Sequence, residues 1–268
     1  MAIDRTAKVH RKAEIGDGVE IGAFTVIGEN VRIGDGTRVG NNVTIVGHTE
    51  IGKRNTIYHN VVMGTSPQDL RYAGMETRLV IGDDNTFREF VTVNIGTAEG
   101  GAVTILGNRN YLMACSHVAH DCTLEDEIVM ANGTLLAGHV KVETGVVTSG
   151  AAAVHHFTTI GTMAFVGGLT RVVQDVPPYM MIEGESNLPL RVNSRRMKRL
   201  GCTDEAIAQV EEAFRLIYRS KRVRAEVLAE LAARKDAGAE VQRLVKFLQD
   251  MTEGKKGRFL ESVRDEQW

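Results

Sequence analysis

The sequence carries five histidines within one stretch, where apolar residues recur at every sixth position. They are His117, His120, His139, His155 and His156. If three hexads make one turn of a coil, residues 18 apart stack on one another. His120 should then lie beneath Gly138 and beside His139, on rungs about 4.8 Å apart. Neutral imidazole accepts a proton near physiological pH, so this stack is a candidate for acid–base chemistry.

The elements that position these histidines are predicted by a six-residue repeat that begins near the N-terminus. Apolar residues stand at every sixth position from Ile3 to Met63, and glycine directly follows each of the five from Ile15 to Val39. A period of six fits neither an α-helix nor a simple alternating strand, but it is typical of short strands joined by tight corners. We therefore predict a parallel β-helix, in which the apolar residues fill a narrow interior and the glycines permit the bends.

Two loops interrupt the repeat, one near residues 64–79 and one near 96–103. Loops in an otherwise strict repeat are often where function sits. The first loop contains the polar residues Gln68, Asp69 and Arg71, so we expect it to take part in binding. For the second loop, a functional role and a simple insertion both fit the sequence.

The repeat ends at Pro177 and Pro178, which cannot donate hydrogen bonds to a ladder of strands. Beyond them the apolar spacing becomes helical, and Thr203 stands where it can cap a helix. We predict a mainly β protein with a β-helix over residues 1–178 and a small C-terminal α-helical domain over residues 179–268.

Composition excludes several classes of function. A net charge of -2 gives no electrostatic case for binding nucleic acid. No apolar run approaches the roughly 18 to 20 residues that a membrane span needs, and the first residues lack a signal-peptide core. The three cysteines form no CxxC pair, so neither a disulfide framework nor a zinc ribbon is expected. We expect a cytoplasmic protein that needs no cofactor and does not insert into membranes.

Several motifs together resemble a known family. They are QDL in the first loop, SHVAHDC, LAGHV, AVHHF and the QDVPPY that ends the repeat. Spread over nearly the whole chain, they are similar to the bacterial acyl-[acyl-carrier-protein]:UDP-N-acetylglucosamine O-acyltransferases of lipid A biosynthesis. The resemblance implies a left-handed β-helix and a homotrimer with sites between subunits. It also implies transfer of a (R)-3-hydroxyacyl chain from acyl carrier protein to the 3-position of UDP-N-acetylglucosamine.

The resemblance assigns catalytic roles to three residues. His120 matches the general base, which would take a proton from a sugar hydroxyl. Asp121 matches the residue that supports this base. Neighbours on a strand point to opposite faces, so that role requires the chain to turn at Asp121. Gly138 matches the oxyanion donor, which acts through its backbone N–H.

The resemblance also implies substrate contacts. Matches to sugar and acyl-chain contacts are Gln68, Asp69 and His139, and matches to nucleotide contacts are His155, Asn193 and Arg199. Arg71 and His156 are further candidate substrate contacts. Gly168 matches the position whose side chain limits the length of the acyl chain. His117 ends a hexad, where a structural role and a contact at the rim are both open.

Six positions depart from the family pattern. Asn94 and Ile95 replace a His-Arg pair, Arg71 a lysine, His156 a glutamine, Arg195 a glutamate and Leu200 the second of two arginines. These changes concern the phosphate contacts and the choice of sugar, and they leave the base untouched.

A basic stretch follows the coil and is a candidate docking surface for the acidic acyl carrier protein. Its charged residues are Arg191, Arg195, Arg196, Lys198 and Arg199. A solvated connector, or a set of nucleotide contacts only, is the alternative.

Other functions remain open on the sequence alone. The acceptor could be a 3-amino sugar nucleotide, or the enzyme could be a CoA-dependent acetyltransferase or the N-acyltransferase of the same pathway. A zinc protein similar to the γ-class carbonic anhydrases would use three histidines across a subunit interface, although we predict no metal site. A purely structural β-helix would explain the hexads but not the clustered histidines.

Overall fold

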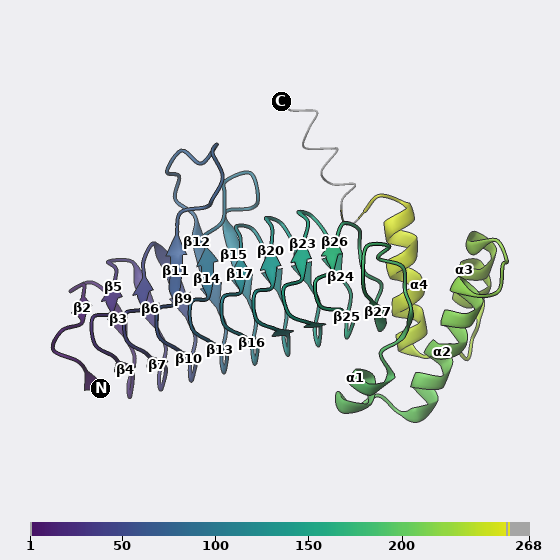
Figure 1. Ribbon diagram of the computed structural model, residues 1–268, viewed down its shortest axis with the longest axis horizontal. Coiled ribbons are helices and arrows are strands. Elements are labelled where there is room, and N and C mark those ends of the chain that lie inside the picture. Colours follow the sequence, from purple (N-terminus) through teal and green to yellow (C-terminus); the bar gives the residue numbers. More distant parts are fainter. Residues whose placement is uncertain (1, 256, 258–268) are drawn as a thin grey trace.

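The molecule is a long coil with helices at one end. The computed structural model describes residues 2–255 and 257. Figure 1 shows the coil along the long axis, two loops that leave its side, and the helices beyond its last turns. The predicted helical domain extends to residue 268, so its last part lies outside the described residues.

Short strands form three parallel sheets in the part of the chain that the structure describes, one on each side of the coil. The first sheet contains β1 (Ala2–Ile3), β4 (Glu20–Ile21), β7 (Arg38–Val39), β10 (Thr56–Ile57), β13 (Thr86–Phe87), β16 (Tyr111–Leu112), β19 (Val129–Met130), β22 (Val147–Thr148), β25 (Phe165–Val166), β27 (Met180–Ile182) and β28 (Arg191–Val192). The second contains β2 (Lys8–Val9), β5 (Val26–Ile27), β8 (Thr44–Ile45), β11 (Val62–Thr65), β14 (Thr92–Asn94), β17 (His117–Val118), β20 (Leu135–Leu136), β23 (Ala153–Val154) and β26 (Arg171–Val172). The third contains β3 (Glu14–Ile15), β6 (Val31–Ile33), β9 (His48–Ile51), β12 (Arg78–Ile81), β15 (Val103–Leu106), β18 (Thr123–Leu124), β21 (Lys141–Val142) and β24 (Thr159–Ile160).

The register of the sheets confirms the predicted stacking of residues 18 apart. Leu112 pairs with Met130, and Val118 pairs with Leu136. Each strand therefore lies directly above the strand one turn earlier. The antiparallel pair of β27 and β28 closes the first sheet.

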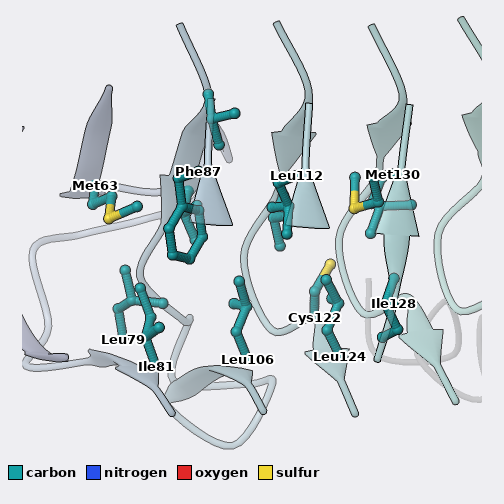
Figure 2. Close-up of a cluster of buried hydrophobic side chains, with 14 of the residues drawn as sticks. Met63, Leu79, Ile81, Phe87, Leu106, Leu112, Cys122, Leu124, Ile128 and Met130 are labelled. Carbon is teal, nitrogen blue, oxygen red and sulfur yellow. The ribbon is translucent and has the colours of Figure 1, made fainter. Parts of the chain in front are cut away.

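The core is the stack of hexad residues inside the coil, as predicted. Figure 2 shows Leu112, Leu124 and Met130 pointing into this interior, and all three side chains are fully buried. The polar hexad residue Thr148 is also buried. Its hydroxyl lies 2.9 Å from that of Thr134, and this hydrogen bond offsets the cost of burying it. Ile3, in the first strand of the described residues, is 39% exposed.

The glycines that follow the hexad residues have a different role from the predicted one. A Cβ added to Gly22 would lie 2.3 Å from Oδ1 of Asn41, which accepts a hydrogen bond from the N–H of Ala23. Glycine is needed there for the close approach of two turns. The corners themselves are made by residues of positive φ, such as Phe24 at 58° and Asn42 at 55°.

The two loops leave the coil between β11 and β12 and between β14 and β15. Their bases touch, because the N–H of Arg78 donates to the carbonyl of Ala102 at 2.9 Å and the N–H of Gly96 donates to that of Arg78 at 3.2 Å. Both loops thus rise from adjacent turns on one side of the coil (Figure 1).

The coil gives way to helices over several residues rather than at the prolines alone. Val176 bridges to Ile160, and β27 then pairs with β25, so sheet pairing continues past Pro178. The helices are α1 (Ser194–Arg199), α2 (Asp204–Tyr218), α3 (Arg224–Ala233) and α4 (Ala239–Thr252). As predicted, the Thr203 side chain caps α2 by accepting from the N–H of Ala206. Each helix within residues 2–255 and 257 is too short or too polar to cross a bilayer.

Arg196, from the predicted docking stretch, is a structural residue. Its guanidinium donates to the carbonyl oxygens of Gly145 at 2.8 Å and Glu127 at 2.5 Å. These carbonyls belong to corners of successive turns, so Arg196 fastens α1 to the coil and is only partly exposed.

Candidate active site

A corner of the coil between β17 and β18 brings His120 and Asp121 together. Asp121 has φ of 59°, so the chain turns there, as the supporting role of Asp121 requires. Both side chains then lie on the same side of the backbone. Nδ1 of His120 donates to Oδ2 of Asp121 at 2.7 Å.

This hydrogen bond fixes the tautomer of His120. A carboxylate only accepts hydrogen bonds, so the proton of the neutral imidazole must stand on Nδ1. Nε2 therefore carries a lone pair and can accept a proton. The His120 side chain is 12% exposed, enough for a substrate to reach it.

The Asp121 carboxylate is fully buried beneath the second loop. Thr97 donates to it twice, from its backbone N–H to Oδ1 at 2.8 Å and from its hydroxyl to Oδ2 at 2.6 Å. Burial alone would raise the pKa of Asp121, but the hydrogen bonds from His120 and Thr97 outweigh it and hold that pKa below its usual range. The Asp121 side chain behind the imidazole therefore favours its ionised form.

Gly138 lies directly against the His120 ring, one turn further along the coil. A Cβ added there would be 2.5 Å from Cε1 and 2.7 Å from Nε2 of His120. The carbonyl of Gly138 accepts from the N–H of Phe157 at 3.2 Å, whereas its N–H has no backbone acceptor among the described residues. That N–H is therefore available to a ligand.

His139 completes the cluster from the next rung, as the stacking predicted. Its ring meets that of His120 edge-on, with centroids 5.2 Å apart. Its Nε2 lies 3.6 Å from Oδ2 of Asp121. Its other neighbour is Phe157, whose ring stacks on it at a centroid distance of 4.5 Å. The contact with Phe157 was not predicted, although Phe157 lies 18 residues beyond His139 and so stacks on it in the coil.

A cavity of about 730 Å³ opens over this cluster. Eight predicted site residues line it: Gln68, Asp69, Arg71, His117, His120, Gly138, His139 and His156. The sequence analysis missed the apolar wall of the cavity, which consists mainly of Leu135, Leu136, Ala153 and Val154. Leu135 and Ala153 each precede a hexad residue, so strand alternation turns them outward, and this signal could have identified them.

The first loop places an ion pair at the cavity. The Arg71 guanidinium donates to both carboxylate oxygens of Asp69, at 3.0 and 2.7 Å. These bonds, together with the charge of His120, lower the pKa of Asp69 despite its partial burial. Asp69 therefore offers an ionised acceptor to a hydroxyl or amine of a ligand.

His117 also lines the cavity, and its side chain contacts a residue of the preceding turn of the coil. Its Nδ1 lies 2.7 Å from the hydroxyl of Thr92. Burial and then the charge of His120 lower the pKa of His117, which favours its neutral form.

Four predicted substrate contacts lie outside this cavity. His155 packs against His156 with ring centroids 4.2 Å apart. Gly168 sits at an exposed corner further along the coil. Asn193 and Arg199 line a separate cavity of about 590 Å³ at the helical end, where the Asn193 side chain donates to the carbonyl of Met163 at 2.8 Å.

The departures from the family pattern have partly structural roles. The Asn94 amide donates to the hydroxyl of Thr65 at 3.0 Å and to the carbonyl of Ser66 at 3.1 Å, so it holds the base of the first loop. Ile95 is buried, and Arg195 lines the cavity of Asn193 and Arg199.

A metal ion could also be bound by His120, Asp121 and His139. Each offers one possible ligand atom, and these atoms all lie within 4.8 Å of one another. Oδ2 of Asp121 already accepts from His120 and Thr97, so binding a metal through it would disrupt both hydrogen bonds. The arrangement suits proton transfer better than metal binding.

Comparisons with known proteins identify a family to which the chain is similar. The family model "UDP N-acetylglucosamine O-acyltransferase, domain 2" matches residues 175–257, and "bacterial transferase hexapeptide (six repeats)" matches residues 12–47 and 30–65. The acyl-[acyl-carrier-protein]–UDP-N-acetylglucosamine O-acyltransferase of Thiobacillus denitrificans is 47% identical over 246 residues, which cover 92% of this chain and 95% of that protein. The enzyme of the same name from Herminiimonas arsenicoxydans is 44% identical over 256 residues, which cover 94% of this chain and 98% of that protein.

Solved structures extend the likeness to three dimensions. The UDP-N-acetylglucosamine O-acyltransferase of Moraxella catarrhalis has a TM-score of 0.89 at 36% identity, covering 96% of this chain and 99% of its own. The UDP-N-acetylglucosamine acyltransferase of Bacteroides fragilis has a TM-score of 0.90 at 34% identity, covering 95% and 98%. These matches confirm the predicted left-handed parallel β-helix with its helical C-terminus. The chain is an enzyme of the acyl-[acyl-carrier-protein]–UDP-N-acetylglucosamine O-acyltransferase family.

Proposed function

We propose that the protein transfers a (R)-3-hydroxyacyl chain from acyl carrier protein to the 3-hydroxyl of UDP-N-acetylglucosamine, the first step of lipid A biosynthesis. The observation that carries this proposal is the corner where Asp121 holds Nδ1 of His120 and the backbone of Gly138 lies close to the same ring. These residues can supply a base and an oxyanion donor, which acyl transfer requires. We place the enzyme in the cytoplasm.

The first chemical step is attack by the sugar. Nε2 of His120 removes the proton of the 3-hydroxyl, and the oxygen forms a bond to the thioester carbonyl carbon. The carbonyl oxygen takes up the negative charge and accepts a hydrogen bond from the Gly138 N–H. Asp121 stabilises the imidazolium that forms, because its carboxylate keeps a negative charge behind the ring.

The second step releases the carrier. The carbon–sulfur bond breaks, and the imidazolium of His120 returns its proton to the sulfur of the leaving thiol. The products are the 3-O-acylated sugar nucleotide and the free thiol of acyl carrier protein. His120 and Asp121 are back in their starting states.

The two walls of the cavity suit the two substrates. The apolar wall of Leu135, Leu136, Ala153 and Val154 can hold an alkyl chain, while Asp69 and His139 can bond sugar hydroxyls. Acyl carrier protein would dock on the exposed members of the basic stretch, Arg191, Arg195, Lys198 and Arg199, without the structural Arg196.

The protein is expected to act as a homotrimer with each site shared between subunits. His120 and Arg199 line separate cavities of one chain, so a second chain is needed to place a nucleotide contact beside the base. Sedimentation should therefore give a trimer.

Mixed trimers of His120→Ala and Arg199→Ala chains should regain activity that neither variant has alone. Some of their sites combine an intact His120 from one chain with an intact Arg199 from another. Full activity in a stable monomer would refute the shared site.

Gly168 is expected to leave the acyl groove open to long donors. It lies 48 residues beyond His120, or about 2.7 turns of the coil, which is ~13 Å at the spacing of strands. A methylene group advances an extended chain by ~1.25 Å, so this distance spans roughly ten methylenes. An added Cβ meets its nearest atoms at 3.4 Å, and a larger side chain is therefore tolerated with small shifts.

Gly168→Met should shift the preference of the enzyme toward shorter acyl donors by filling the groove. The measurement is kcat/KM over a series of acyl carrier proteins with different chain lengths. The same donor profile in folded wild-type and Gly168→Met enzyme would show that another residue sets the length.

The proposed function is tested by the release of thiol from acyl carrier protein. Release should require both UDP-N-acetylglucosamine and a 3-hydroxyacyl donor. Release with acetyl-CoA would favour the acetyltransferase alternative, and release only with the 3-amino sugar nucleotide would favour that acceptor. No release by a folded trimer with any donor would favour a structural role.

A further inference from the structure

The second loop reaches from the preceding turn of the coil to the carboxylate of Asp121. Thr97 stands near its start and is 2% exposed. Its N–H binds Oδ1 of Asp121 at 2.8 Å and its hydroxyl binds Oδ2 at 2.6 Å. One residue thus holds both oxygens, which fixes the rotation of the carboxylate about its Cβ–Cγ bond.

The loop also orients the hydroxyl of Thr97. The N–H of Gly100 donates to Oγ1 of Thr97 at 3.2 Å, so the hydroxyl proton is left to point at Asp121. A Cβ added to Gly100 would lie 2.0 Å from Cγ of Asp121 and 2.3 Å from each carboxylate oxygen. The loop backbone therefore packs directly on the carboxylate and keeps water from it.

Oδ2 of Asp121 is the oxygen on which the site converges. It accepts from Nδ1 of His120 at 2.7 Å and from Thr97 at 2.6 Å, and Nε2 of His139 lies 3.6 Å away. If the carboxylate turned, Nδ1 of His120 would lose its aligned acceptor. The direction in which Nε2 points into the cavity depends on that alignment.

We infer that Thr97 is a positioning residue for the proposed base: its two hydrogen bonds lock the Asp121 carboxylate in the rotation that aims His120 at the acceptor hydroxyl. This inference rests on the proposed function of His120. The sequence allowed the second loop to be either functional or a simple insertion. The inference gives this loop a role in the chemistry.

The hydroxyl of Thr97 should also tune the charge at the site. The hydroxyl and Nδ1 of His120 both donate to Oδ2 of Asp121. The hydroxyl therefore takes up part of the negative charge of that oxygen and weakens its attraction for the imidazolium. The other charged or titratable groups that act on His120 are His117, His139 and the Asp69–Arg71 pair. None of these is altered by a substitution at Thr97.

The test compares Thr97→Val with Thr97→Ser. Valine keeps the backbone N–H but removes the hydroxyl, so kcat should fall by about tenfold, the effect of losing one hydrogen bond to a charged group. The acid limb of the kcat/KM profile, which reports the base, should move to higher pH, because Oδ2 of Asp121 no longer shares its charge with the Thr97 hydroxyl. Serine keeps the hydroxyl and should restore both values.

Thr37→Val is the matched control. Thr37 is also buried, and its hydroxyl donates to the carbonyl of Gly52 at 3.1 Å on a turn without site residues. This variant should lose stability but keep kcat and the acid limb of the wild type. A Thr97→Val enzyme that behaves like Thr37→Val would overturn the inference.

Failure of the inference differs from failure of the proposed function. If His120→Ala retained activity, the proposed base would fall and Thr97 with it. If His120→Ala were inactive while Thr97→Val kept the wild-type kcat and acid limb, only the role of Thr97 would be refuted.

Discussion

His120→Ala is expected to lower kcat by roughly 10² to 10⁴, the usual contribution of a general base. The loss follows from the geometry, because Asp121 fixes the proton on Nδ1 and leaves Nε2 as the proton acceptor that opens on the cavity. KM for the sugar nucleotide should change much less, since other residues would hold that substrate. Steady-state transfer rates at several pH values, normalised to folded enzyme, provide the measurement.

His59→Ala is the matched control for this variant. His59 lies on an early turn of the coil, where its Nδ1 accepts from the N–H of Asn41 at 2.9 Å. Its loss should affect stability slightly and kcat not at all. A His120→Ala enzyme within a few-fold of wild type would remove His120 from the role of base.

Gly138→Ala is expected to lower kcat by about 10² to 10³, the range seen when an oxyanion donor is lost. The added methyl would stand 2.5 Å from Cε1 of His120, closer than two non-bonded carbon atoms can approach. Either the ring is pushed from its hydrogen bond with Asp121, or the chain shifts and misplaces the Gly138 N–H. Stopped-flow or steady-state measurement of acyl transfer would detect both outcomes.

Gly150→Ala tests whether an added methyl group at a corner is harmful in itself. A Cβ at Gly150 would meet its nearest atom, the carbonyl oxygen of Asn132, at 3.7 Å, an ordinary contact. This variant should fold and keep its turnover. Wild-type kcat in Gly138→Ala would show that neither the ring nor the N–H is placed as we describe.

The hexad repeat predicted the fold and the stacking of the site because each turn has the same number of residues. Once the step of 18 is known, His120, Gly138 and His139 must meet, and the structure places them in contact. The turn at Asp121 is required by its chemistry, whereas the periodicity alone does not predict it. The resemblance of motifs supplied the roles of these residues.

Other features could not be predicted, since they depend on contacts outside the repeat. Thr97 reaches Asp121 only because its loop folds back onto the coil, and loop paths are not encoded in a hexad pattern. The structural role of Arg196 likewise depends on how α1 packs against two corners. The glycines after hexad residues were given the wrong role, because turns pack more closely than the sequence reveals.

The most direct test of the account is the structure of the product itself. Purified enzyme would be incubated with UDP-N-acetylglucosamine and a 3-hydroxyacyl donor on acyl carrier protein, and the product analysed by mass spectrometry and NMR. We predict one added 3-hydroxyacyl group in ester linkage at the 3-oxygen of the sugar, formed by wild type and lost in His120→Ala. Folded enzyme that yields no acylated sugar nucleotide, or that acylates another position, would contradict it.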